Sequence, residues 1–198
     1  MNISVILAHP HKGSLNHAIA DAAVRRLEED GHRVIFHDLY AEGFDPVLPY
    51  EEIHRGAPLP PLIARHCGEI AAADGIVVVH PNWWGQPPAI LKGWIDRVLR
   101  PGVAYRFLEG DMGEGVPDGL LAAKTALVFT TSNTPLEREM AVFGDPLEAL
   151  WNRCIFPFCG IQDCRRRNFG VVATSTDGER KRWLEEVRDM VHGAFPGP

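Results

Sequence analysis

Two short segments contain side chains that could together bind a ligand with a flat ring and an anionic end. The first is Asn82-Trp83-Trp84-Gly85-Gln86-Pro87-Pro88, a turn that carries two indole rings and is stiffened by two prolines. The second is His9-Pro10-His11-Lys12-Gly13-Ser14, which precedes a predicted helix start. The free N–H groups and the positive dipole end of such a start attract an anion.

Each segment can also be explained without a ligand. Large aromatic side chains are mostly buried, so Trp83 and Trp84 could be core residues. Ser14 could be the N-cap of an ordinary helix, and His9 could be a histidine that covers the end of the apolar core. The sequence contains neither G-x-G-x-x-G nor G-x-x-x-x-G-K-S/T, so no dinucleotide or P-loop fingerprint supports a nucleotide here. These alternatives stay open on the residue types alone.

The tryptophan turn must be positioned by the run Ile76-Val77-Val78-Val79, which has no polar alternation. Such a run is typical of a central strand in a parallel sheet that is covered on both faces. Strands are predicted at residues 3–8, 34–40, 76–79, 125–131 and 162–172, and helices at 14–29, 61–73, 89–99, 147–156 and 178–192. Residues 41–61 are predicted to be an ordered excursion with short helical pieces, and residues 101–124 to be irregular.

This alternation of strands and helices predicts an α/β fold with a doubly wound, five-stranded parallel sheet of order 2-1-3-4-5. The carboxyl ends of strands one, three and four then lie at one edge. The two ligand segments would meet there with a third turn, Thr130-Thr131-Ser132-Asn133. A chain of 198 residues without repeats predicts one domain over residues 1–198.

The charge balance narrows the class of partner. Twenty basic and 26 acidic side chains give a net charge of −6, which argues against nucleic acid or an anionic membrane as the main partner. The one basic cluster, Arg165-Arg166-Arg167, is expected to be a solvated strand start, with a place beside a nucleotide phosphate as the alternative.

Localisation and redox state are predicted from the amino-terminus and the cysteines. The amino-terminal run has no basic leader and is too short for a membrane span, so a cytoplasmic protein without membrane insertion is expected. The cysteines lack C-x-x-C spacing, which predicts reduced thiols and no metal site. They are Cys67, Cys154, Cys159 and Cys164.

Three motifs resemble those of the NAD(P)H:quinone oxidoreductase family of flavodoxin-like proteins. Pro81-x-x-Trp84-x-x-x-Pro88-Ala89-x-Leu91-Lys92-Gly93-Trp94 is similar to the family's loop that carries the flavin ring. Ala8-His9-x5-Leu15-Asn16, with Ser14, resembles its phosphate loop. Thr130-Thr131-Ser132-Asn133 resembles a Thr-Thr-Gly-Gly turn, with Ser and Asn replacing both glycines. The resemblance runs from residue 3 to about residue 160 and includes Asp38-Leu39-Tyr40 and Phe158-x-Gly160.

The resemblance implies a flavin cofactor and NAD(P)H as the electron donor. FMN is favoured over FAD because the chain lacks the long carboxyl-terminal extension of the FAD-binding mammalian members. No protein acid or base is expected, since flavin N5 is the reactive centre. The implied cofactor-binding residues are His9, Ser14, Leu15, Asn16, Pro81, Asn82, Trp83, Trp84, Gly85, Thr130, Thr131, Ser132 and Asn133. The implied substrate-binding residues are Trp84, Tyr105, Phe107 and Phe143.

The implied reaction is two-electron reduction of a quinone by NAD(P)H in a ping-pong mechanism. Azo dyes or nitroaromatics could be reduced by the same apparatus. The segment 103–107 implies a homodimer in which aromatic side chains reach the partner's flavin. Two alternatives remain: an ancillary regulatory flavoprotein of a potassium-efflux transporter, and a redox sensor or electron carrier. The natural acceptor and the choice between NADH and NADPH stay open.

A tyrosine and a histidine that assist the flavin in better-known quinone reductases have no equivalent in this chain. Alignment through Phe143-Gly144-Asp145 places Glu137 and Phe143 at their positions. Phenylalanine has no proton to give, and a carboxylate would repel the negative charge of the reduced ring. We therefore expect Glu137 to face solvent, Phe143 to form an apolar wall, and backbone N–H groups of residues 130–133 to receive the charge.

Overall fold

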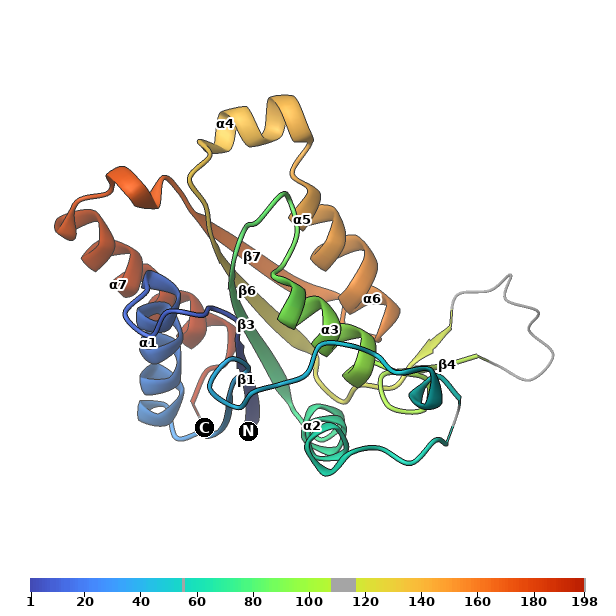
Figure 1. Ribbon diagram of the computed structural model, residues 1–198. Coiled ribbons are helices and arrows are strands. Elements are labelled where there is room, and N and C mark those ends of the chain that lie inside the picture. The colour runs from blue at the N-terminus through green and yellow to red at the C-terminus, as the bar shows by residue number, and fades with distance from the viewer. Residues whose placement is uncertain (55, 108–116, 198) are drawn as a thin grey trace.

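The computed structural model describes residues 1–54, 56–107 and 117–197. Its centre is a parallel sheet with the order β2-β1-β3-β6-β7, which is the predicted order 2-1-3-4-5 counted along the chain (Figure 1). The strands are β1 (Asn2–Leu7), β2 (Arg33–Asp38), β3 (Gly75–Pro81), β6 (Thr125–Thr131) and β7 (Asp163–Phe169). The longer helices are α1 (Leu15–Glu29), α2 (Pro61–Ala71), α3 (Ala89–Val98) and α7 (Asp177–Ala194).

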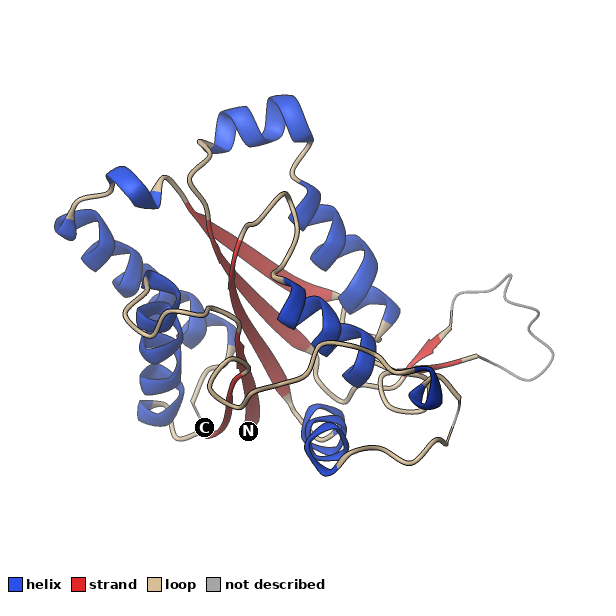
Figure 2. Ribbon diagram, in the orientation of Figure 1, coloured by secondary structure: helices blue, strands red, loops and turns tan. Residues whose placement is uncertain are grey.

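Helices cover both faces of the sheet, so its central strands are buried on both sides (Figure 2). All seven residues of β3 are buried, as its continuous apolar run predicted. Successive side chains of a strand point to opposite faces. Val77 therefore packs in the layer with α1 and α7, while Val78 packs in the layer with α2 and α3. None of the described helices is both long and apolar enough to cross a membrane.

The structure departs from the predicted elements in several places. β3 continues to Pro81, and the N–H of the next residue, Asn82, still donates to the Thr131 carbonyl of β6 over 2.7 Å. The stretch predicted to be irregular contains a short antiparallel pair, β4 (Tyr105–Arg106) and β5 (Asp118–Gly119). The helix predicted at 147–156 is longer and has a π-helical middle. It consists of α5 (Pro146–Glu148), η3 (Ala149–Ile155) and α6 (Phe156–Phe158).

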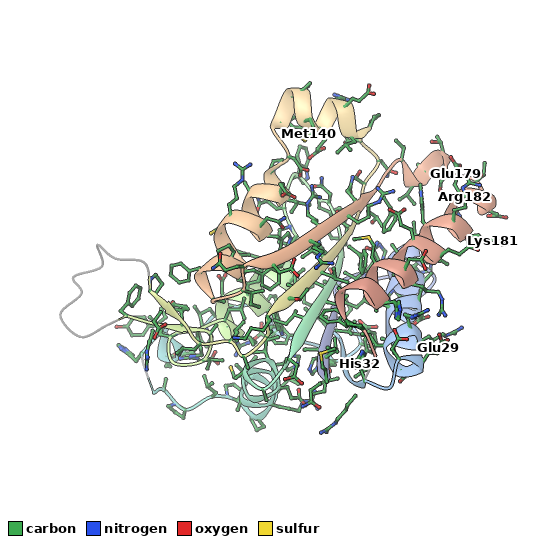
Figure 3. The ribbon with its side chains drawn as sticks, turned by 180° about the vertical axis from the view of Figure 1, so that it is seen from behind. Glu29, His32, Met140, Glu179, Lys181 and Arg182 are labelled. Atoms are coloured by element: carbon green, nitrogen blue, oxygen red, sulfur yellow. The ribbon has the colours of Figure 1, made fainter. Side chains whose placement is uncertain are left out.

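A helical arm that sequence reasoning missed precedes this helix. It is formed by α4 (Leu136–Arg138) and the π-helix η2 (Glu139–Phe143), and Figure 3 shows Met140 on it, at the top of the view. Its large apolar side chains are exposed, so it has no stripe that packs on the core. The remaining short elements are the 3-10 helices η1 (Tyr50–Glu52) and η4 (Val172–Thr174).

The expectation of a solvated arginine cluster is wrong for Arg166. Only 7% of its side chain is exposed, and it pairs with the carboxylates of Asp145 and Glu148. Arg167 pairs with Glu186 over 2.6 Å, and Arg165, which is half-exposed, pairs with Asp163. The two carboxylates that pair with Arg166 belong to α5 and to its N-cap residue Asp145, and they precede Arg166 by 18 and 21 residues in the sequence.

The cysteines are all free thiols, as predicted. Cys67 and Cys159 are buried and Cys154 is exposed. Burial raises the pKa of Cys159 and of Cys164 to about 12, so both remain protonated at neutral pH.

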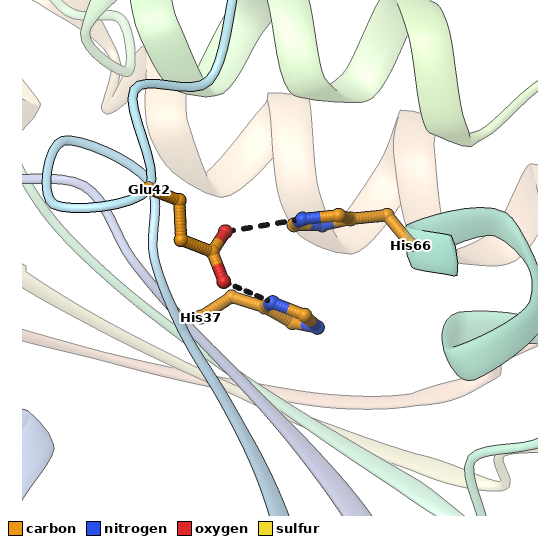
Figure 4. A group of neighbouring side chains, drawn as sticks. All are labelled: His37, Glu42 and His66. Atoms are coloured by element: carbon orange, nitrogen blue, oxygen red, sulfur yellow. Dashed lines mark hydrogen bonds and ion pairs between the residues drawn. The ribbon is translucent and has the colours of Figure 1, made fainter. Parts of the chain in front are cut away.

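One carboxylate joins two stacked histidines between the sheet and the helices (Figure 4). The rings of His37 and His66 lie with centroids 3.9 Å apart. Glu42 places one oxygen 2.9 Å from His37 Nδ1 and the other 3.1 Å from His66 Nε2. Trp94 Nε1 donates to His66 Nδ1 over 3.0 Å. The cluster thereby connects the end of β2 to α2 and α3.

Two histidines and a carboxylate are also the ligand types of a zinc site. An indole N–H can only donate, so Nδ1 of His66 accepts and the proton of the neutral ring lies on Nε2. That nitrogen therefore has no lone pair for a metal ion. We interpret the cluster as a polar contact that holds three elements together.

A second buried histidine is held in the same way. Trp151 Nε1 donates to His80 Nε2 over 3.1 Å, and His80 Nδ1 lies 2.8 Å from the Pro81 carbonyl oxygen. Burial lowers the pKa of His80 to about 4, and burial together with the neighbouring His37 lowers the pKa of His66 to about 3. Both rings are therefore neutral at physiological pH.

We predict that stability falls as pH falls below about 6.5. Because its pKa is lowered on folding, each histidine binds its proton more readily in the unfolded chain, so acid favours unfolding. The stabilisation that comes from keeping these two histidines neutral is complete above 6.5, the pKa of histidine in the unfolded chain. It is lost as the pH falls toward their pKa values in the folded protein, about 3 for His66 and about 4 for His80. Each group adds a slope of up to about 1.4 kcal/mol per pH unit.

The measurement is urea unfolding between pH 7 and pH 5 in wild type and in Trp94→Phe, which removes the indole donor facing His66. The pH slope should be smaller in the variant, because a ring freed from that donor can bind a proton at Nδ1. His54→Gln, which removes an exposed histidine, is the control and should keep the wild-type slope. An unchanged slope in Trp94→Phe would contradict this account of His66.

Candidate functional site

A cavity of about 650 Å³ lies at the carboxyl ends of the central strands. In Figure 1 this is the upper edge of the sheet, where the β3–α3 loop rises and α4 stands above it. Its volume is typical of a site for a cofactor or a drug-sized ligand. The lining residues are His9, Ser14, Leu15, Asn16, Pro81, Asn82, Trp83, Trp84, Gly85, Thr131, Ser132, Asn133, Thr134, Arg138, Glu139, Phe143, Pro146 and Val172.

Among the predicted cofactor-binding residues, only Thr130 lies outside this lining. Thr130 is fully buried, and its hydroxyl donates to Asn168 Oδ1 over 3.0 Å. Phe143 lines the cavity, whereas Glu137 is exposed and does not. The two remaining predicted substrate-binding residues are outside the cavity of their own chain. Tyr105 packs edge-on against Phe158 and Phe107, with ring centroids 4.8 and 5.7 Å away.

The tryptophan turn is a tight two-residue reversal. Trp83 and Gln86 exchange two backbone hydrogen bonds of 3.0 Å, and the central residues Trp84 and Gly85 have φ of 58° and 70°. Left-handed backbone at both central positions is the pattern of a type I′ turn. Glycine suits position 85 because it adopts positive φ without strain. A Cβ at this position would in addition lie only 3.1 Å from Pro146 Cγ.

Trp84 is an outlier in that turn, because a bulky residue with positive φ is strained. The turn presents its indole at 101% exposure, and Trp83 is also exposed. The alternative that these tryptophans are core residues is therefore wrong. Backbone strain that persists at a cavity wall is typical of functional positions, and an exposed tryptophan there can stack on a flat ligand.

The anionic end of the predicted site is the start of α1. Ser14 caps the helix, with its Oγ accepting from the His17 N–H over 3.3 Å. The first turn of α1 contains no acidic residue, so its unpaired N–H groups and its dipole face the cavity without a competing carboxylate. This arrangement can bind a phosphate group.

His9 adds a neutral donor beside that helix start. Its Nδ1 accepts from the His11 N–H over 3.1 Å, which leaves the proton of the neutral ring on Nε2. Burial lowers the pKa of His9, and the nearby His17 and His11 lower it further. His9 can therefore donate one hydrogen bond to an anion without carrying a charge.

Asn16 places an unsatisfied hydrogen-bond acceptor in the cavity wall, between the start of α1 and the tryptophan turn. Its Nδ2 donates to Thr131 Oγ1 over 2.9 Å, while its Oδ1 is buried without a hydrogen-bond partner among the described residues. An unpaired buried acceptor costs roughly 1–3 kcal/mol. A hydroxyl-bearing chain between the anionic end and the flat end of a ligand would satisfy it. These donors and this acceptor fit the phosphate, the polyol chain and the aromatic ring of a flavin.

The arm formed by residues 136–143 contributes two charged residues that sequence reasoning missed, Arg138 and Glu139. Glu139 is buried, and its Oε1 accepts from Asn82 Nδ2 over 3.1 Å. Asn82 Oδ1 in turn accepts from the Gly85 N–H over 2.9 Å. Glu139 thereby fixes the tryptophan turn from the opposite wall. No apolar periodicity marked this arm as a helix facing the site.

The third turn offers fewer free N–H groups than the sequence predicted. The Ser132 N–H donates to the Phe169 carbonyl over 3.0 Å, so it is not available to a ligand. Asn133 uses its side chain to hold the chain beyond β7, accepting from the Ala173 N–H over 2.9 Å.

Comparison with known proteins assigns the chain to a family. The sequence profile of a family described as a flavodoxin-like fold matches residues 1–190. An uncharacterized NAD(P)H oxidoreductase of Haemophilus influenzae is 37% identical over 190 residues, which cover 93% of this chain and 91% of that protein. NAD(P)H dehydrogenase (quinone) 1 of Cavia porcellus is 34% identical, over 93% of this chain and 76% of its own.

A solved structure agrees with these sequence matches. The NAD(P)H:quinone oxidoreductase from Methanothermobacter marburgensis superposes with a TM-score of 0.84 at 25% identity, covering 98% of this chain and 96% of that one. Together with the sheet order and the cavity at its carboxyl edge, these matches show that the chain belongs to the family of proteins with the flavodoxin-like fold.

Proposed function

We propose that the protein is a flavin-dependent NAD(P)H:quinone oxidoreductase that holds FMN in the cavity. The observation that carries the proposal is the combination, in one cavity, of an acid-free helix start and an exposed tryptophan in a left-handed turn. The names of the relatives from Haemophilus influenzae and Cavia porcellus support NAD(P)H as the donor, and the latter name supports a quinone as the acceptor.

The bound flavin would supply the hydride chemistry, accepting from NAD(P)H and passing two electrons to the acceptor. The protein's residues bind and orient. The start of α1 and His9 would hold the phosphate, Asn16 Oδ1 would accept from the polyol chain, and the tryptophan turn would support the ring. Phe143 would form the apolar wall of the acceptor space, where it excludes water. We favour FMN over FAD because the first turn of α1 provides a single anion site.

The cofactor can be identified directly. The purified protein should show the absorbance of an oxidised flavin, and mass analysis of the released compound should give FMN. The protein should also oxidise NAD(P)H steadily in the presence of a quinone, with ping-pong kinetics. A protein that is colourless and binds neither added FMN nor FAD would contradict the proposal, and flavin binding without turnover would instead favour a redox sensor.

Replacing Trp84 with Ala should weaken FMN binding by about 1 kcal/mol or more, the value of one aromatic stack. The measurement is the dissociation constant of FMN by quenching of flavin fluorescence. Tyr50→Ala is the matched control, since Tyr50 is an exposed aromatic that does not line the cavity. Equal affinities of wild type and Trp84→Ala would show that this indole does not contact the ring.

Replacing Glu137 with Gln, or Phe143 with Leu, should change turnover less than tenfold, roughly 1.4 kcal/mol. Glu137 is exposed outside the cavity, and Phe143 offers no proton. A true general acid usually contributes about a hundredfold or more. Stopped-flow rates of both half-reactions, with cofactor content checked, are the measurement. A much larger loss in Glu137→Gln, with cofactor still bound, would show that Glu137 does supply a proton and would contradict this account.

We also propose a homodimer in which Tyr105 and Phe107 approach the partner's cavity. Neither ring lines the cavity of its own chain, and Phe107 is 46% exposed. Sedimentation at micromolar concentration should therefore give twice the mass of one chain. Phe107→Ala should raise the KM for the quinone while FMN content stays the same. A fully active monomer would contradict the dimer.

A further inference from the structure

The cap of α1 is part of a three-residue chain of hydrogen bonds. Ser14 Oγ lies 3.0 Å from His17 Nδ1, and His17 Nε2 lies 3.2 Å from Asp38 Oδ2. Asp38 is the last residue of β2, and its other oxygen accepts from the N–H groups of Tyr40 and Ala41. The side chains of His17 and Asp38 are each 13% exposed. Asp38 is thus fixed with one oxygen aimed at the imidazole.

The partners decide where His17 carries its proton. A carboxylate can only accept, so Nε2 must be protonated in either charge state of the ring. In the neutral ring, Nδ1 is then an acceptor, and the Ser14 hydroxyl donates its only proton to it. In that state Ser14, which lines the cavity, offers an anion nothing but oxygen lone pairs.

The protonated ring reverses the direction of that hydrogen bond. Nδ1 then donates to Ser14 Oγ, and the hydroxyl proton of Ser14 is released to donate to a phosphate. The cation stands within the first turn of α1, where the helix dipole favours an anion and opposes a positive charge, so Asp38 and the bound phosphate must stabilise it. The charged or titratable groups that the structure places next to it are Asp38 and His9, whose ring centroid lies 6.2 Å from that of His17. Asp38 stabilises the cation, and the neutral His9 does not oppose it.

We propose that His17 takes up a proton from solvent when the phosphate of the cofactor binds, and that this protonation turns Ser14 from an acceptor into a donor toward the phosphate. His17 is therefore a positioning residue for the cofactor's anionic end, held by Asp38. The inference rests on the proposed function for the identity of the ligand. It implies that affinity for a phosphorylated flavin falls as pH rises, while affinity for the same ring without phosphate does not.

The test compares FMN with riboflavin, which has the same ring and polyol but no phosphate. Dissociation constants are measured on flavin-free protein from pH 6.5 to 8.5, where the FMN phosphate is mostly dianionic, since its second pKa is about 6. The affinity ratio of FMN to riboflavin should fall by about tenfold across this range, with a ceiling of tenfold per pH unit for one proton. Taking the ratio cancels titrations that affect both flavins equally.

Calorimetry gives an independent readout. The heat of FMN binding, measured at one pH in buffers of different ionisation enthalpy, should show proton uptake that riboflavin binding lacks. In His17→Gln the proton uptake and the pH slope should both disappear, and FMN affinity at pH 6.5 should fall about tenfold, as expected for one lost charge-assisted hydrogen bond. Asp38→Asn should weaken the proton uptake, because it removes the charge that stabilises the imidazolium.

Two further variants make the assignment specific. His192→Gln removes a half-exposed histidine on α7 and should keep the wild-type slope. His9→Gln should lower FMN affinity but also keep the slope. If the slope survives in His17→Gln, or is lost in His9→Gln, the role given to His17 is wrong. Equal slopes for FMN and riboflavin overturn it as well. Failure of both flavins to bind would instead contradict the proposed function.

Discussion

Parallel pairing of β3 with β1 on one side and β6 on the other is the interaction on which the site depends. Leu7 pairs with Val79, and Pro81 pairs with Thr131. The loops that follow β1, β3 and β6 therefore begin next to one another at the carboxyl edge of the sheet. A slip of one residue would exchange the two faces of a strand. Because β3 is buried on both faces, such a slip would disrupt both helical layers. The register of the core therefore fixes the distance between the anionic end and the tryptophan turn.

Sequence reasoning was sufficient where a signal lies within one segment. The apolar run of β3 predicted a central strand, and Ser14 predicted a helix cap. It failed where the partner is distant in the sequence. The burial of Arg166 depends on Asp145 and Glu148, and the arm of residues 136–143 has no apolar face that packs on the core. The inward position of Glu139 depends on Asn82, 57 residues away.

Three histidines of this protein accept a hydrogen bond from a backbone or indole N–H group. His66 and His80 each accept from a tryptophan, and His9 accepts from a backbone N–H. A ring that must accept cannot readily bind a second proton, so these three stay neutral. His17 differs because both of its partners can accept a hydrogen bond from the ring. The Asp38 carboxylate can only accept, and the Ser14 hydroxyl can either donate or accept. Burial lowers the pKa of His66, His80 and His9, and the donor facing each ring also disfavours a second proton.

The arginines of β7 have a consequence for how molecules of this protein meet. β7 is an edge strand, and the outer side of such a strand is where a strand of another molecule could add. Asp163, Arg165 and Arg167 put charge along that edge, and their ion pairs hold it in place. A second copy that approached edge to edge would have to strip water from these pairs. Edge-to-edge growth of the sheet through β7 is thereby disfavoured.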